Sequence, residues 1–270
     1  MKGFFLSLRS EFYKTRKTAG FWSAIFLPVV LCLIIAYNFY KHADNLHVLP
    51  SMILWLRFSG IILGVMGTLL LPMLIVFISY SINSIEHKAD TWKSIFSLPI
   101  PKASIYISKI VYAILLIFLC LLLFLGFTIA LGNLMGMMNP ALKFGDYNIN
   151  NYLAAVYLKL FLCSMGILSI QFLLSLLFRD FLKPMGIGFI ATITGVIAVT
   201  QNWDYNYIFP YSQPLLAMQS MVGPSHKKGV MGIPVMPTVE IFTREVWVGL
   251  VIAAVVFALG FVIVQKKSVK

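Results

Sequence analysis

The sequence predicts an all-α integral membrane protein with six transmembrane helices, and three observations lead to this fold class. Of 270 residues, 60% are hydrophobic and only 11% are charged, which is far from the composition of a soluble domain. Apolar runs recur along the whole chain, each about as long as a helix needs to cross a bilayer, roughly 20 residues. The runs are continuous rather than alternating, so they indicate helices and not the strands of a barrel.

We expect the whole chain, 1–270, to form one transmembrane domain. The basic N-terminus precedes an apolar run that is too long for a signal peptide and that no small-residue cleavage site follows, so we take this run as the first span. The six predicted spans are 19–40, 58–82, 105–131, 152–178, 184–201 and 246–264.

Residues 1–18 have the pattern of an amphipathic helix lying in the headgroup layer. Phe4, Phe5, Leu8 and Phe12 share one helical face, and basic side chains surround the other, namely Arg9, Arg16 and Lys17. The alternative is an ordinary basic flank of the first span.

Small residues mark two helix faces that are suited to close packing. Gly60, Gly64 and Gly67 lie at near-helical spacing in the second span. A second stripe in the fifth span favours packing against another helix or another subunit, and it consists of Gly188, Thr192 and Gly195. Pro28 and Pro72 lie inside the first two spans, and we expect Pro28 to bend its helix.

Lys159 is the one charged residue well inside a predicted span. It lies about two turns from the outer end, so we expect its ammonium to reach the headgroups along the helix surface. The alternative is a functional cation that faces the interior of the bundle. Residues 202–245 form an outer segment rich in aromatics and proline, and we expect part of it to be a half-inserted helical element.

The basic residues predict the orientation of the chain. Fourteen of the 21 lysines and arginines fall on the side that holds both termini. An excess of positive charge marks the cytoplasmic side, so we expect a multi-pass protein of the cell membrane with both termini in the cytoplasm. The net charge of +12 then reflects this topology and contact with anionic lipid, and no nucleic-acid partner is expected.

We find no motif for catalysis in the chain, and no catalytic, cofactor-binding or metal-ligating residue is expected. The phosphate-binding loop ending in Gly-Lys-Ser/Thr is absent, as are His-Glu-x-x-His and Gly-x-Ser-x-Gly. The three cysteines lie in apolar runs without metal spacing. All nine acidic residues fall in predicted loops or at span ends, so we expect energy for transport to come from outside the chain.

The cytoplasmic loop at 84–102 is the longest polar segment on that side. As a helix over 85–97 it places Ile85, Ala89, Trp92 and Phe96 on one face, and the prolines at 99 and 101 end it. An amphipathic helix with an aromatic anchor is suited to docking on a soluble partner. A helix lying on the lipid explains the same pattern equally well.

Two sequence stretches resemble a known family. Glu86, then Thr91-Trp92-Lys93, then Leu98-Pro99-Ile100 with Lys102, Tyr106 and Lys109, are similar to the cytoplasmic loop of ABC-2 type permeases. The lantibiotic-immunity and multidrug branch is the most similar. The run YIFPYSQPLLAM at 207–218 resembles the aromatic box that such permeases carry before their last span.

This resemblance implies an exporter subunit that pairs with a second permease, identical or different, and with a separate ABC ATPase. The helix over 86–97 would be the coupling helix in a groove of that ATPase, with Trp92 as packed anchor and Glu86 and Lys93 at the rim of the groove. The residues to which the resemblance assigns coupling are Glu86, Asp90, Trp92, Lys93, Phe96, Leu98 and Pro99. The cargo would be a hydrophobic or amphipathic compound, such as an antimicrobial peptide or a drug.

Two other functions fit parts of the sequence. A membrane scaffold or sensor that recruits a cytoplasmic partner would need the same loop helix. A carrier or channel that works without ATP is disfavoured by the lack of ionisable groups in the middle of the predicted spans.

Overall fold

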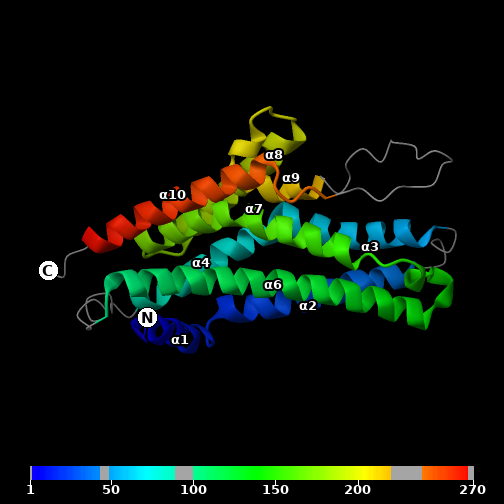
Figure 1. Ribbon diagram of the computed structural model, residues 1–270, viewed down its shortest axis with the longest axis horizontal. Helices are drawn as coiled ribbons and strands as arrows, with labels where there is room; N and C mark the ends of the chain where they lie inside the picture. Colours follow the sequence, from blue (N-terminus) through cyan, green and yellow to red (C-terminus); the bar gives the residue numbers. More distant parts are fainter. Residues whose placement is uncertain (1, 43–48, 89–99, 220–238, 267–270) are drawn as a thin grey trace.

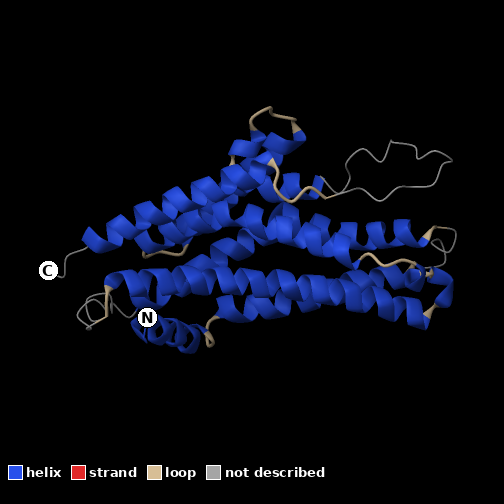
Figure 2. Cartoon of the chain, in the orientation of Figure 1, coloured by secondary structure: helices blue, strands red, loops and turns tan. Residues whose placement is uncertain are grey.

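The computed structural model describes residues 2–42, 49–88, 100–219 and 239–266, and this part of the chain is helical with connecting loops and no strand (Figure 2). Its α-helices are α1 (Lys2–Thr15), α2 (Ala19–Lys41), α3 (Ser51–Val65), α4 (Leu71–Lys88), α6 (Lys102–Met138), α7 (Asn150–Leu177), α8 (Leu182–Thr200), α9 (Gln213–Gln219) and α10 (Arg244–Lys266). The short helical turns are η2 (Met66–Leu70), η3 (Pro140–Leu142), η4 (Phe144–Asp146), η5 (Asn206–Ile208) and η6 (Pro210–Ser212).

Six stretches of the described chain are long and apolar enough to cross a membrane, as predicted. They are α2, the stretch Ser51–Lys88, α6, α7, α8 and α10. Four of them begin and end close to the predicted spans. The second and third are much longer, at 38 and 37 residues, because the helices continue into the polar segments on both sides.

The second span is interrupted in its middle by a π-helical turn. Pro72 lies in the first turn of α4, where it has no N–H to offer the carbonyl of Thr68 and its ring crowds that carbonyl. The five residues of η2 form a wider π-helical turn just before the proline, as happens where the regular pattern of i→i−4 hydrogen bonds is broken. The hydroxyl of Thr68 donates to the Gly64 carbonyl at 2.8 Å. The span is therefore two helices, α3 and α4, joined at a deformable point.

The helices form an elongated bundle around α7 (Figure 1). Of the most apolar stretch of α7, 67% is buried, which is the highest share among the six candidate spans. Helices α4 and α10 pack against α7, while α1 and α2 pack against α6 on the other side of the bundle (Figure 1). The buried serines of α7 at positions 164, 169 and 175 are hydrogen-bonded, because each hydroxyl donates to the backbone carbonyl three residues earlier.

An aromatic cluster closes the end of the bundle opposite α1. The indole N–H of Trp55 donates to the Phe144 carbonyl at 2.9 Å, and the Trp55 and Phe144 rings are 4.9 Å apart in an edge contact. Gly132 on α6 lies directly against the Trp55 ring, which leaves no room for a larger residue there. This contact fixes the loop after α6 against α3.

The outer segment enters the bundle more deeply than predicted. Within its described part, η6 and α9 place Tyr211, Ser212, Gln213 and Ala217 in buried positions between α7, α8 and α10. The side chain of Met218 packs against Gly67 at the interruption of the second span. The expected half-inserted element is thus a wedge between spans, and it explains the glycine at position 67.

Gly60 and Gly64 do not have the close helix contact that was predicted for them. A Cβ at either position would have no neighbour within 4 Å. The space beside both glycines is therefore open within the described part of the chain.

The end of α10 lies at the same end of the bundle as α1 (Figure 1). The Tyr106 hydroxyl, near the start of α6, donates to the Phe257 carbonyl of α10 at 2.9 Å. The junction of α4 and α6 is at this end as well, since the ion pairs described next join them to α1.

Candidate functional site

Four charged side chains from three helices meet at the end of the bundle that holds α1. Lys109 of α6 is central: its Nζ lies 2.8 Å from Glu86 Oε1 of α4 and 2.9 Å from Glu11 Oε2 of α1. Lys14 of α1 lies 3.2 Å from Glu11 and 3.3 Å from Glu86 Oε1. We call these four residues the charge cluster. It connects α1 to α4 and α6, the helices on either side of residues 89–99.

The charge cluster is buried and balanced. Glu11, Glu86 and Lys109 are each 1% exposed, and only Lys14 reaches solvent, with 33% of its side chain exposed. Two carboxylates face two ammonium groups, so the formal charges of the cluster cancel. Removing one partner of such a set leaves a buried charge without compensation, which typically costs about 3–5 kcal/mol.

Neighbouring hydrogen bonds hold α1 in place. Thr15 donates to the Tyr112 hydroxyl at 2.5 Å, and the Ser7 and Ser108 hydroxyls are 2.7 Å apart. Lys109 also donates to the Ile82 carbonyl at 3.2 Å.

Burial favours the neutral form of Lys14, but the carboxylates of Glu11 and Glu86 outweigh this effect and raise the pKa of Lys14 above 10.5.

The face of α1 that packs on the bundle is polar, a contact that the amphipathic pattern alone did not predict. Ser7, Glu11 and Thr15 are buried, whereas Phe5 and Phe12 are 65% and 46% exposed. The aromatic side of α1 therefore faces outward, where lipid would lie. The spacing of Ser7, Glu11 and Thr15, one every four residues, was the sequence signal for this face, and the hydrophobic pattern concealed it.

Of the predicted coupling residues, the structure describes only Glu86. Its carboxylate is 1% exposed and lies in the charge cluster, whereas the resemblance implied a contact with the rim of the ATPase groove. Its second oxygen has no hydrogen-bond partner among the described residues. Six further predicted coupling residues lie outside the described residues: Asp90, Trp92, Lys93, Phe96, Leu98 and Pro99. Ile100 follows them, and its Cγ2 lies 3.8 Å from where a Cβ at Gly3 of α1 would be.

Lys159 does not reach the headgroups, so that expectation is wrong. It is 1% exposed and its Nζ lies 3.1 Å from Glu245 Oε1, in the first turn of α10. The pair connects α7 to α10 inside the bundle. Sequence reasoning missed it because Glu245 lies 86 residues further along the chain and was assigned to a loop end.

The predicted small-residue stripe of α8 faces the interior of the same chain. A Cβ at Gly188 would meet Gln171 and Val76, and one at Gly195 would meet the backbone of Tyr211 and Ser212. Thr192 is fully buried between them. These contacts are with α4, α7 and η6.

Sequence reasoning also missed a line of buried amide and hydroxyl groups beside α7. The Asn83 amide donates to Ser175 Oγ at 2.8 Å, and the His87 ring lies 3.1 Å from the Ser175 carbonyl. Further along α7, the Gln171 amide donates to the Tyr211 hydroxyl at 2.6 Å. These groups join α4 and η6 to α7 by polar contacts within an apolar bundle.

Among the described residues, no three or more histidine, cysteine or acidic side chains gather as metal ligands would.

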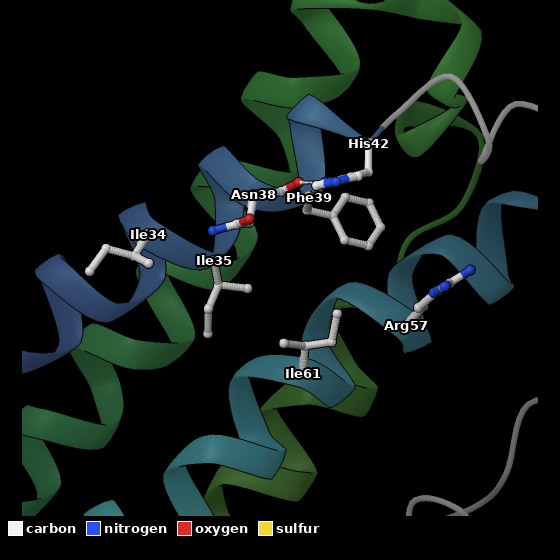
Figure 3. Close-up of a pocket in the computed structure, with 7 residues that line it drawn as sticks. All are labelled: Ile34, Ile35, Asn38, Phe39, His42, Arg57 and Ile61. Carbon is white, nitrogen blue, oxygen red and sulfur yellow. Dashed lines mark hydrogen bonds between the residues drawn. The ribbon is translucent and has the colours of Figure 1, made fainter.

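A groove separates α2 from α3 (Figure 3). Its end near His42 has a volume of about 520 Å³, lined by Ile34, Ile35, Asn38, Phe39, His42, Arg57 and Ile61. A second part, of about 680 Å³, continues along the same helices and is lined by Ser23, Phe26, Leu27, Val30, Leu31, Ile34, Ile35 and Val65. The shared residues Ile34 and Ile35 join the two parts into one groove.

A comparison with protein families finds one match that covers most of the chain. The family described as ABC-2 family transporter protein matches residues 7–195. The matched residues begin in α1, end in α8 and include all four members of the charge cluster. No curated protein and no solved structure matches the chain.

Proposed function

Because the chain belongs to the ABC-2 family of transporter proteins, we propose that this membrane-spanning transport subunit works as an exporter driven by a separate ABC ATPase. The cargo is a hydrophobic or amphipathic compound, and the subunit acts in a pair with an identical or different permease. Within the family we propose the lantibiotic-immunity or multidrug branch, because of the loop at 86–109 and the aromatic box at 207–218.

The Glu86–Lys109 ion pair is the observation that carries this proposal. The two residues lie on α4 and α6, the helices that enter and leave the cytoplasmic loop, and Glu11 and Lys14 add α1 to the same cluster. A push on the loop is thereby transmitted to three helices together. The loop residues Trp92 and Phe96 make the contact with the ATPase, and the charge cluster behind them transmits the movement.

Membership of a transporter family favours this function over a scaffold or sensor. The lysines and arginines support a cytoplasmic position for α1, the loop at 84–102 and the end of α10. Labelling of single cysteines with a membrane-impermeant reagent tests this orientation, since Cys32, Cys120 and Cys163 are buried. In sealed right-side-out vesicles, Trp203→Cys should react and Lys266→Cys should not.

The ATPase partner is tested by purifying the tagged chain from membranes of its own cells and measuring ATP hydrolysis. Trp92→Ala with Phe96→Ala should remove most of the ATPase from the preparation. Trp203→Ala is the matched control, because Trp203 is 50% exposed and lies in the outer segment. Full ATPase activity with the double loop variant would refute the assignment of the loop.

The charge cluster is tested in the same preparation. Glu86→Gln should retain the bound ATPase but change its rate of ATP hydrolysis, because the loop is intact while its connection to Lys109 is weakened. Loss of the ATPase itself from the Glu86→Gln preparation would place Glu86 in the contact instead.

A further inference from the structure

The groove between α2 and α3 combines an apolar trough with a basic mouth. Ile34, Val30 and Leu27 on α2 and Ile61 and Val65 on α3 follow helical spacing along its walls. Three polar lining residues, Asn38 and His42 of α2 and Arg57 of α3, lie at one end of the groove (Figure 3). Ser23, at the other end, donates its hydroxyl to the Gly20 carbonyl of its own helix. The groove is therefore amphipathic along its length.

The mouth carries positive charge without an acidic lining residue. Among the described residues that line it, Arg57 is the only one with a permanent charge and none is acidic. The His42 ring is held beside it by a hydrogen bond from Nδ1 to the Asn38 carbonyl, at 2.8 Å. The guanidinium and the Asn38 amide are donors of the kind that bind phosphate oxygens.

The trough has the length of a lipid chain in one leaflet. His42 and Val30 are twelve residues apart on α2, which corresponds to about 18 Å along the helix. The hydrocarbon of one leaflet is about 15 Å deep, half of the roughly 30 Å core.

We infer that this groove binds an acidic phospholipid, with its phosphate at Arg57 and an acyl chain along α2 towards Val30. A second copy of the chain is a poorer occupant, since a symmetric contact over the mouth would bring two Arg57 side chains together. A cationic peptide is disfavoured by the same charge. In the proposed orientation the lipid lies in the outer leaflet. Binding itself depends neither on that orientation nor on an ATPase.

The test compares chain-labelled fluorescent phosphatidylglycerol with phosphatidylcholine carrying the same label, titrated onto the purified protein. The wild-type protein should bind phosphatidylglycerol about fivefold more tightly, as expected for one basic group near the phosphate. Arg57→Gln should remove this preference. Arg244→Gln is the matched control, because it removes one exposed arginine from the start of α10, outside the groove.

A second variant tests the trough. Ile61→Trp should weaken binding of both lipids, because Ile61 is 42% exposed on the groove wall and the larger ring fills the space without entering the core. Equal affinity of the wild-type protein for the two lipids, or an unchanged preference in Arg57→Gln, would overturn the inference. Spontaneous disulfide-linked dimers of Ile34→Cys would overturn it as well, because they would place a second copy over the groove.

Discussion

The ammonium of Lys109 lies 2.8 Å from Glu86 Oε1, and both side chains are 99% removed from solvent. Glu86 is near the end of the second span and Lys109 near the start of the third, so this pair fixes the distance between α4 and α6 at one end of the bundle. Glu11 is bound by the same ammonium, which makes the docking of α1 dependent on the same lysine.

Lys109→Met should destabilise the protein by about 3–5 kcal/mol, because it leaves two buried carboxylates facing only Lys14, which is one-third exposed. Thermal unfolding in detergent measures the loss. Lys183→Met is the control: its pair with Asp180 is exposed on both sides, and such pairs contribute about 0–1 kcal/mol. Equal effects of the two substitutions would mean that the charge cluster is solvated.

Lys159→Met should also destabilise the protein, by about 3 kcal/mol, since Glu245 then stays inside the bundle without its cation. The double variant Lys159→Met with Glu245→Gln should recover most of the loss, because neither charge remains. Unfolding temperatures of the two single variants and the double variant give the coupling between the residues. Additive losses would show that the pair contributes nothing as a pair.

Gly195→Ala should cost about 1–3 kcal/mol, because the added methyl group would lie 2.7 Å from the backbone of Tyr211, which cannot move aside as a side chain could. Gly64→Ala should be neutral or slightly stabilising, since the space around it is open and alanine favours helix. The two variants are compared by thermal unfolding. A large loss for Gly64→Ala would indicate that a partner covers that side of α3.

Lys14 should give the stability a dependence on alkaline pH. Its pKa in the folded protein is raised above 10.5 by Glu11 and Glu86, so its contribution is fully present below that value and is lost as the pH rises through the folded pKa. The difference in unfolding temperature between wild type and Lys14→Gln should therefore be constant from neutral pH to about 10 and shrink above it. A difference that grows with pH would contradict this sign.

The number of spans and the position of most of them could be predicted from the sequence, since lipid imposes both helix and length on apolar runs. The ends were less predictable because α4 and α6 continue into segments whose polar residues are buried by other parts of the chain. Lys109 illustrates the difficulty: it falls within the predicted third span, but its burial between Glu11 and Glu86, which compensate its charge, was not predicted.

The partners of buried polar residues could not be predicted, because they are distant in sequence. Glu11 and Lys109 are 98 positions apart, and Asn83 and Ser175 are 92 apart. Periodicity shows which face of one helix is polar and says nothing about which other helix that face meets. The half-inserted element was predicted, but its burial between α7, α8 and α10 was not, because the seven residues of α9 are too few to show which of its faces is apolar.

Helix α6 has mechanical consequences of its own. It is 37 residues long and contains no proline, which gives a straight rod of about 55 Å, longer than the bilayer core. A tilt of about 5° at the Lys102 end moves the Met138 end by roughly 5 Å, enough to separate side chains in contact. The same tilt displaces Lys109, which is less than two turns from the Lys102 end, by about 1 Å. The rod therefore amplifies movement: the ion pairs at one end can stay formed while the aromatic cluster at the other end opens.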